Sequence, residues 1–135
     1  MADVSKLKVS NTTYDIKDTT ARNNIADSGW QNVTQNQGTW AYAQCRKIGK
    51  MVEVRGSISS LGVTSGAVLT LPSGYAPSQD IQVYGPCGWV TDPCIVRWYI
   101  GTNGAITMDW CLSLVNGSSV TVNTWKKICI TYMID

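Results

Sequence analysis

The sequence predicts an all-β fold, an antiparallel β-sandwich or jelly-roll-like domain that follows a short N-terminal hairpin-plus-helix segment. Beyond residue 28, polar and apolar residues alternate with a period of two in short runs, as they do in half-buried strands. Turn signals that contain Gly, Pro or Asn separate these runs. Eight or so short strands with one apolar face each bury those faces when two antiparallel sheets pack together.

The composition divides the chain at residue 28. Residues 1–28 hold eight charged side chains, whereas residues 29–135 hold only twelve in 107 positions. Ser, Thr, Asn and Gln make up 40 of the 135 residues, and charged residues only 15%, against about 25% in an ordinary soluble domain. We therefore expect an attachment or oligomerisation segment at 1–28 and a weakly charged β-domain at 29–135.

The first segment reads as a hairpin followed by a weak helix. Polar and apolar residues alternate on both sides of Ser10 and Asn11, which predicts two short strands around a turn. Asp18 can cap a helix over 19–26. Because that helix is short and has few apolar residues, it needs a partner surface. The apolar side chains expected to make this contact are Leu7, Val9, Tyr14, Ile16 and Ile25.

Eight segments of the second part are expected to be strands. Their ranges are 39–45, 51–58, 67–71, 81–84, 95–100, 105–111, 119–125 and 128–134. The turn signals between them include Ile48-Gly49-Lys50, Pro72-Ser73-Gly74, Asn103-Gly104 and Asn116-Gly117.

The alternation also predicts which side chains face the core. In the strand 51–58, three aliphatic residues share one face. Trp98 falls on the apolar face of its strand, and its neighbours Arg97 and Tyr99 fall on the exposed face. The same rule places Trp110 in the core.

The sequence lacks the residues that several classes of function require. The absence of histidine excludes a Ser-His-Asp or Cys-His triad and any imidazole metal ligand. No C-x-x-C pair indicates zinc, no Gly-rich loop indicates a phosphate cofactor, and the net charge of +2 indicates no nucleic-acid partner. No apolar run has the length of a signal peptide or of a membrane span. We expect a protein without metal or cofactor, made in a bacterial cytoplasm without export and not inserted in a membrane.

Among the five cysteines, Cys87 and Cys94 are close enough in sequence for a disulfide that closes a loop. The alternative is that the cysteines serve as small buried apolar side chains. Since their number is odd, at least one thiol stays outside any intrachain pair.

Aromatic and polar residues crowd together between residues 89 and 110. Trp89 lies in a segment, 85–94, whose Gly, Pro and Cys residues suggest a constrained loop. A ring there could cover the C–H face of a sugar while polar neighbours bind its hydroxyl groups, or it could plug one end of the sandwich. The candidate ligand-binding residues are Trp89, Asp92, Arg97, Tyr99, Asn103 and Asp109.

An alternative hypothesis is that Asp92 and Asp109 are the catalytic residues of a glycan depolymerase. A glycosidase needs two carboxylates that face each other across the scissile bond, and these two acids border Trp-rich strands. The other interpretation assigns Asp92 to a Thr-Asp-Pro turn and Asp109 to the polar face of its strand, with no catalytic residue in the chain.

Several motifs resemble structural proteins of tailed bacteriophages and prophages. Residues 6–22, KLKVSNTTYDIKDTTAR, resemble an N-terminal motif of phage fibre proteins. Four further segments resemble, in order, the receptor-binding tips of fibres from phages of Gram-positive hosts. They are the segment 42–58, LPSGYAP at 71–77, TNGAI at 102–106 and ICITYMI at 128–134. The sequence departs from that pattern at Ala76, where such proteins often carry Arg, and in the extra segment 85–94.

The resemblance implies a homotrimeric, non-enzymatic virion protein. Its β-sandwich head would touch a host-surface glycan or protein, and its N-terminal segment would bind phage tail or capsid proteins. The alternative from another class is a monomeric lectin-like carbohydrate-binding module.

Overall fold

The computed structural model describes the backbone of residues 6–9 and 12–15 and, in full, residues 25–59, 61, 66–88, 93–120 and 125–135. Within these ranges the chain forms eleven strands, and every pairing between them is antiparallel. The expected all-β, antiparallel fold is therefore confirmed. The strands are β1 (Lys6–Val9), β2 (Thr12–Asp15), β3 (Gln31–Asn32), β4 (Thr34–Gln35), β5 (Thr39–Ile48), β6 (Met51–Ser59), β7 (Leu69–Thr70), β8 (Ile81–Cys87), β9 (Cys94–Ile100), β10 (Ala105–Ser113) and β11 (Lys126–Met133).

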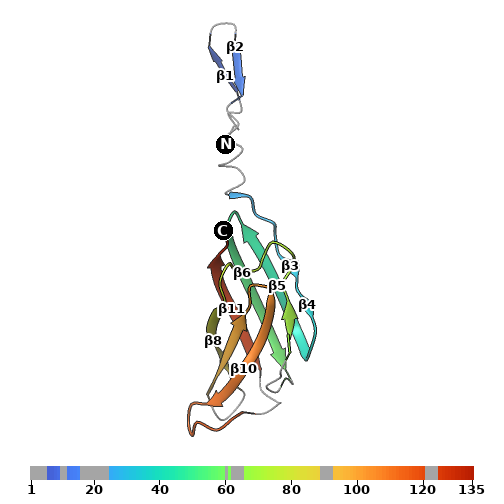
Figure 1. Cartoon of the computed structure of the whole chain (residues 1–135), viewed down its shortest axis with the longest axis vertical. Helices are drawn as coiled ribbons and strands as arrows, with labels where there is room; N and C mark the ends of the chain where they lie inside the picture. Colours follow the sequence, from blue (N-terminus) through green and yellow to red (C-terminus); the bar gives the residue numbers. More distant parts are fainter. Residues whose placement is uncertain are drawn as a thin grey trace.

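The expected N-terminal hairpin is present as a two-stranded sheet of its own (Figure 1). Leu7 pairs with Tyr14 and Val9 pairs with Thr12. Ile16 and most of the helix expected over 19–26 lie outside the described residues.

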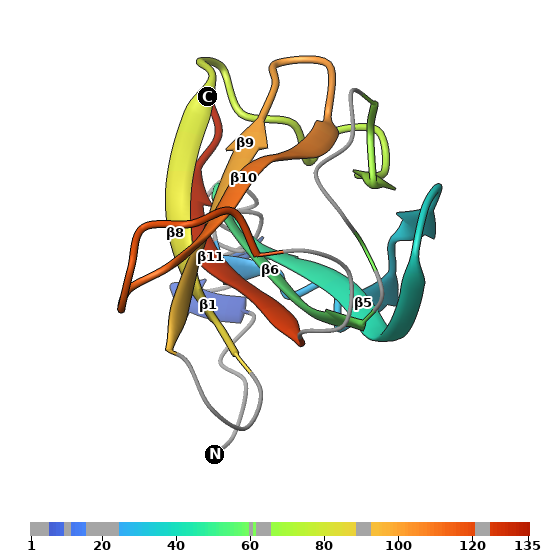
Figure 2. The same cartoon turned by 90° about the horizontal axis from the view of Figure 1, so that it is seen from below.

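The other nine strands form one sheet in the order β3-β5-β6-β11-β8-β9-β10-β7-β4. Its two outermost strands, β3 and β4, are neighbours in the chain, separated only by Val33. One segment, 31–35, thus pairs with β5 through one half and with β7 through the other. The sheet curves round so that this segment joins its two edges (Figure 1, Figure 2), and a closed sheet leaves few unpaired strand edges.

Backbone hydrogen bonds on both sides of Val33 hold this junction. The Val33 amide donates to the carbonyl of Ala43 at 3.0 Å, and the Asn36 amide donates to Val68 at 2.9 Å. The Val33 side chain is buried in the core. The alternation did not predict β3 and β4, because each is two residues long and mostly polar.

Inside the curved sheet lies one hydrophobic core. Trp98 on β9 is fully buried at its centre, as its position in the alternation predicted. Its ring centroid lies 6.2 Å from that of Trp40, and its indole N–H donates to the carbonyl of Lys127 at 2.9 Å. Gly85 makes this approach possible, since a Cβ at residue 85 would lie 2.3 Å from the same carbonyl oxygen.

The expectation that Trp110 lies in the core is wrong. The register between β9 and β10 shifts between Met108 and Trp110, so that Asp109 is an extra residue on β10. This β-bulge reverses the alternation: Met108 is fully buried, Asp109 and Trp110 are both half-exposed, and Cys111 returns to the core.

Other strand predictions differ in detail. The strand expected at 67–71 is limited to β7. On β6, Ser57 is buried although it alternates with the aliphatic residues of the strand. The strand expected at 119–125 is reduced, in its described part, to a single bridge between Ser119 and Leu112. Residues 121–124 lie outside the described residues.

Among the described residues, no helix has the length and apolar character required to cross a membrane.

Replacing Trp98 by alanine should lower the free energy of unfolding by about 3–5 kcal/mol, because it leaves a large cavity in the core. Trp110→Ala is the matched control, and its half-exposed ring should cost on the order of 1 kcal/mol. Urea unfolding followed by circular dichroism measures both values. Equal losses in the two variants would contradict the assignment of Trp98 to the core and Trp110 to the surface.

Stability should fall as the pH rises above about 9. Burial raises the pKa of the Cys45 thiol from 9.0 to about 11, so between these values the folded chain keeps a proton that the unfolded chain loses. Removing this group in Cys45→Ala should make the decline shallower by up to about 1.4 kcal/mol per pH unit. Urea unfolding at a series of pH values tests this, and identical slopes in both proteins would contradict it.

Candidate ligand-binding surface

Three neighbouring strands, β8, β9 and β10, present a row of large side chains on the outer face of the sheet. Arg97 on β9 pairs with Tyr84 on β8 and with Trp110 on β10. Because directly opposite residues on adjacent strands point to the same face, all three side chains stand side by side. We call these residues, together with Asp109, the outer-face patch.

The members of the patch contact one another. Arg97 Nη2 lies 3.0 Å from Asp109 Oδ2, and its guanidinium carbon lies 5.3 Å from the centroid of the Trp110 ring. The Tyr84 and Trp110 rings are 5.7 Å apart and inclined at 52°. The bulge on β10 permits this arrangement, since it turns both Asp109 and Trp110 outward.

Parts of the patch remain available to a ligand. Tyr84 is 57% exposed, far more than a ring in the core. Arg97 Nε has no hydrogen-bond partner within the described residues, but it is buried and is therefore not part of the surface that a ligand can contact. The patch therefore offers flat apolar rings and a charged pair.

Tyr99 lies beside the patch, one residue pair further along β9, opposite Gln82 and Thr107. A hydrogen bond to Asp80 raises the pKa of Tyr99, with a smaller effect of desolvation. Asp80 Oδ1 also accepts from the Thr102 amide at 3.1 Å. Asp80 thus accepts hydrogen bonds from both the Tyr99 hydroxyl group and the Thr102 amide.

The remaining predicted residues are not part of this group. Asn103 Oδ1 accepts from the Ala105 amide at 3.0 Å, which gives Asn103 a place in the turn between β9 and β10. Trp89 and Asp92 lie outside the described residues. Cys87 and Cys94 lie opposite each other on the adjacent strands β8 and β9, and none of the five cysteines forms a disulfide. The structure thus brings together Arg97, Tyr99 and Asp109 of the predicted set.

The sequence analysis missed two members of this surface for different reasons. Tyr84 could have been found, because it alternates with the inward-facing Ile81 and Val83. Trp110 could not, since no feature of the sequence marks Asp109 as the extra residue of a bulge.

A second exposed cluster, on the outer face of β5 and β6, was also missed. Arg55 and Arg46 stack on Trp30, with their guanidinium carbons 3.7 Å and 4.8 Å from its ring centroid. Arg46 pairs with Glu53 and, at 3.6 Å, with Asp27. This cluster borders a groove of about 260 Å³. Its aromatic ring, Trp30, is 37% exposed, against 57% for Tyr84 of the outer-face patch.

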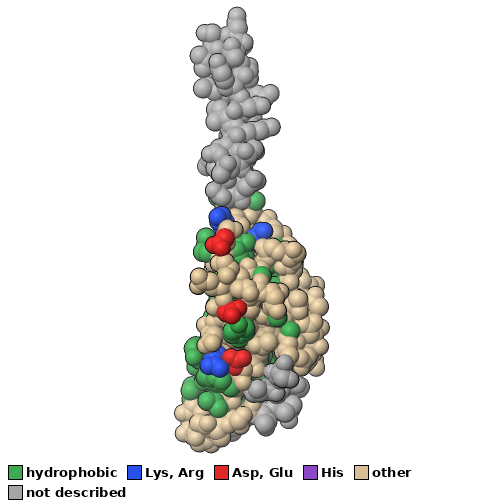
Figure 3. Space-filling view, viewed as in Figure 1, with side chains coloured by type: hydrophobic (Ala, Val, Ile, Leu, Met, Phe, Trp, Pro, Cys, Tyr) green, Lys and Arg blue, Asp and Glu red, His purple; other side chains and the backbone are tan. Residues whose placement is uncertain are grey.

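Charge is sparse on the visible surface. Figure 3 shows that backbone and other side chains make up most of this face, and that its few acidic and basic side chains are spread along the length of the head. Within the described part of the chain, no group of three or more Cys, Asp or Glu side chains could hold a metal ion.

Comparison with known proteins gives an informative likeness to solved structures. No family model matches the chain, and no curated protein matches its sequence. Among solved structures, the chain is similar to the head domain of phage bIL170, reported in a study of a common fold for the receptor-binding domains of lactococcal phages. The two share 15% sequence identity with a TM-score of 0.56, over 78% of this chain and 97% of that one. The closed β-sheet of this chain therefore has the fold of a phage receptor-binding head domain.

Proposed function

We propose that this protein is a fibre or receptor-binding protein of a phage virion, which recognises the surface of a Gram-positive host cell. The observation that carries the proposal is the fold likeness, which extends over nearly all of the bIL170 head domain. The order of fibre-like sequence motifs supports it independently. In this assignment residues 29–135 form the head, and residues 1–28 attach it to phage tail or capsid proteins.

The outer-face patch is the part of the head that we assign to host recognition, with a surface glycan as its ligand. Tyr84 and Trp110 supply flat apolar rings that can cover the C–H groups of a sugar. Arg97 and Asp109 lie beside them and can bind its hydroxyl groups. A neutral polyhydroxylated ligand suits a surface with few charges better than an anionic polymer does.

The contacts of Asp109 favour binding over hydrolysis. A glycosidase needs one carboxyl group as acid and a second as base or nucleophile. Asp109 is engaged by Arg97, and the second acid of that alternative, Asp92, lies outside the described residues. A non-enzymatic role is the simpler reading of this arrangement.

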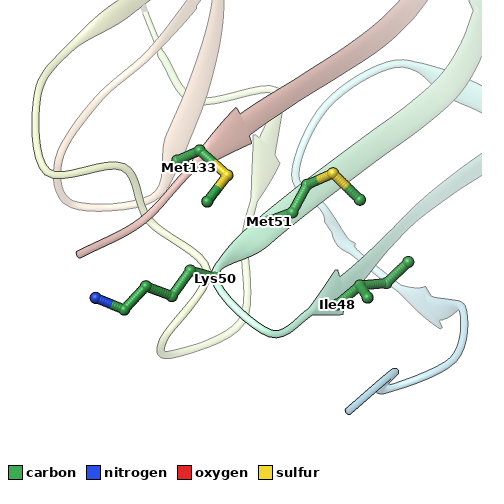
Figure 4. A pocket seen from close by; sticks show the side chains of 4 residues that line it. All are labelled: Ile48, Lys50, Met51 and Met133. Atoms are coloured by element: carbon green, nitrogen blue, oxygen red, sulfur yellow. The ribbon is translucent and has the colours of Figure 1, made fainter. Parts of the chain in front are cut away.

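We further propose that the head is a homotrimer, with contacts at the end of the barrel from which the N-terminal segment departs. Ile48, Lys50, Met51 and Met133 line a groove of about 460 Å³ there (Figure 4). Met133 is 64% exposed. Large exposed apolar side chains around a groove are typical of interaction surfaces.

The N-terminal segment joins the head at this same end. The Gly49 amide donates to the carbonyl of Ala26 at 2.9 Å, and Asp27 bridges to Ile48. Ile25, one of the residues expected to make oligomer contacts, is 73% exposed. Copies that meet here would bury Ile25 and Met133 and align their N-terminal segments.

Tyr84→Ala and Trp110→Ala should each weaken binding to host cell-wall glycans about tenfold, because each removes one ring of the patch. Tyr42→Ala is the matched control, since Tyr42 is 43% exposed on β5 and should not affect binding. A fluorescently labelled protein, tested against cell walls of a panel of Gram-positive bacteria and on a glycan array, measures the effect.

Normal binding by both patch variants would contradict this assignment of the ligand site. Sugar release by the wild-type protein that is lost in Asp109→Asn would favour the depolymerase. Glycan binding by a monomer would favour the lectin-like module.

Size-exclusion chromatography with light scattering should give three times the chain mass of 14.7 kDa. Met133→Asp should shift the protein toward the monomer without changing its circular dichroism, since Met133 is exposed in one chain but would be buried in the trimer. Met133→Leu is the matched control that retains the apolar contact. A monomeric wild-type protein would contradict the trimer.

A further inference from the structure

Three cysteine thiols gather inside one end of the barrel, in a place that the proposed function does not use. Cys87 ends β8, Cys94 begins β9, and Cys111 lies on β10 after the bulge. Cys94 and Cys111 are buried, whereas Cys87 is only partly buried. The Sγ atoms of Cys87 and Cys111 lie 2.9 Å apart. This is less than 1 Å longer than a disulfide bond of about 2.05 Å.

The bulge on β10 also creates this pair. With unbroken alternation Trp110 would face inward and Cys111 outward. Because Asp109 is the extra residue, Cys111 instead points into the core, where β8 brings Cys87 to it. Cys94, the cross-strand neighbour of Cys87, also makes side-chain hydrogen bonds with Cys87 and Cys111, so it is the competing partner that the test must exclude.

A buried lysine belongs to the same cluster. Lys126 pairs with Cys87 on the adjacent strand and is fully buried. Burial raises the pKa of Cys111, and the nearby Lys126 ammonium group opposes this effect. Burial also raises the pKa of Cys87 and lowers the pKa of Lys126. Both thiols are therefore mostly protonated at neutral pH, and the small thiolate fraction is the form that reacts.

Cys87 also lies within reach of solvent. It lines a groove of about 210 Å³ together with Pro86, Gly88, Trp125 and Lys127. A small oxidant can approach the Cys87 sulfur through this groove, whereas Cys111 behind it is fully buried.

We propose that Cys87 and Cys111 form an oxidation site, in which a peroxide converts the two thiols into an intrachain disulfide. The Cys87 thiolate attacks the peroxide: an S–O bond forms, the O–O bond breaks, and hydrogen peroxide leaves one oxygen as water. The Cys111 thiolate then attacks the sulfur of this sulfenic acid. The S–S bond forms, the S–O bond breaks, and the second oxygen leaves as water. Two thiols lose two electrons in total, and one peroxide gains them.

The disulfide would stabilise the end of the barrel next to the β8–β9 loop. It would join residues that are 24 positions apart in the sequence and would tie the end of β8 to β10, its second neighbour in the sheet beyond β9. This inference is independent of the ligand that the head binds.

Tryptic mapping distinguishes this disulfide from the pair Cys87–Cys94 expected from the sequence. Cleavage after Arg55, Arg97 and Lys126 places Cys87 and Cys94 in peptide 56–97 and Cys111 in peptide 98–126. The full chain is treated with hydrogen peroxide, its remaining thiols are alkylated, and it is digested without reductant. We expect peptides 56–97 and 98–126 to be joined, and reduction to separate them.

Cysteine variants identify the partner and provide the controls. Cys94→Ser should keep the joined peptides, whereas Cys87→Ser should lose them. Cys129→Ser is the matched control at an exposed thiol and should behave as the wild type. The oxidised wild-type protein should melt on the order of 5–10 °C higher than the reduced protein, and oxidised Cys87→Ser should show no such rise.

Two results would overturn the proposal. A disulfide within peptide 56–97 alone would assign the bond to Cys87 and Cys94, and joined peptides in Cys87→Ser would assign it to Cys94 and Cys111. Neither result would affect the proposed receptor-binding function, which is measured with the reduced protein and the patch variants.

Discussion

The single extra residue on β10 controls both faces of the sheet around it. Asp109 interrupts the alternation, so that the residues after it exchange their expected sides, whereas Met108 before it stays in the core. Trp110 leaves the core and joins Tyr84 and Arg97 outside, while Cys111 enters the core beside Cys87. Without the bulge, Trp110 would face the core and Cys111 would face outward, so neither the patch nor the thiol pair would form. Bulges are common at barrel rims and next to functional sites, because they redirect side chains and bend the strand.

A second bulge acts in the same way on β5. Ala41 is extra between Trp40 and Tyr42, so Trp40 packs on Trp98 inside while Tyr42 is exposed. Two irregular strands help the sheet to curve, and the short segment 31–35 then pairs with both of its edges. Closure buries the aromatic core, and the core in turn holds the strands in register. The outer-face patch is therefore rigid because its three strands belong to a closed sheet and not to a free hairpin.

This arrangement explains why residues 29–135 contain few charged side chains. A head that binds by stacking rings on a neutral sugar, and that packs against copies of itself, needs few ionic groups. Charges that are present on the described surface occur largely as pairs or stacks, such as Arg97 with Asp109 and Arg55 on Trp30. These charged side chains orient aromatic rings more than they create an electrostatic field far from the surface.

The sequence by itself determined the fold class, most strand positions and the burial of Trp98, because alternation of period two reports directly which side chains a sheet must hide. It also placed Arg97 and Tyr99 outside. It could not determine which face of β10 carries Trp110, the contact between the Cys87 and Cys111 thiols, or the closure of the sheet through residues 31–35. A bulge shifts the alternation by one residue without leaving a compositional mark, and closure depends on hydrogen bonds between segments far apart in the chain. Only the tertiary structure determines these features, because the curvature of the whole sheet decides which residue becomes the extra residue of a bulge.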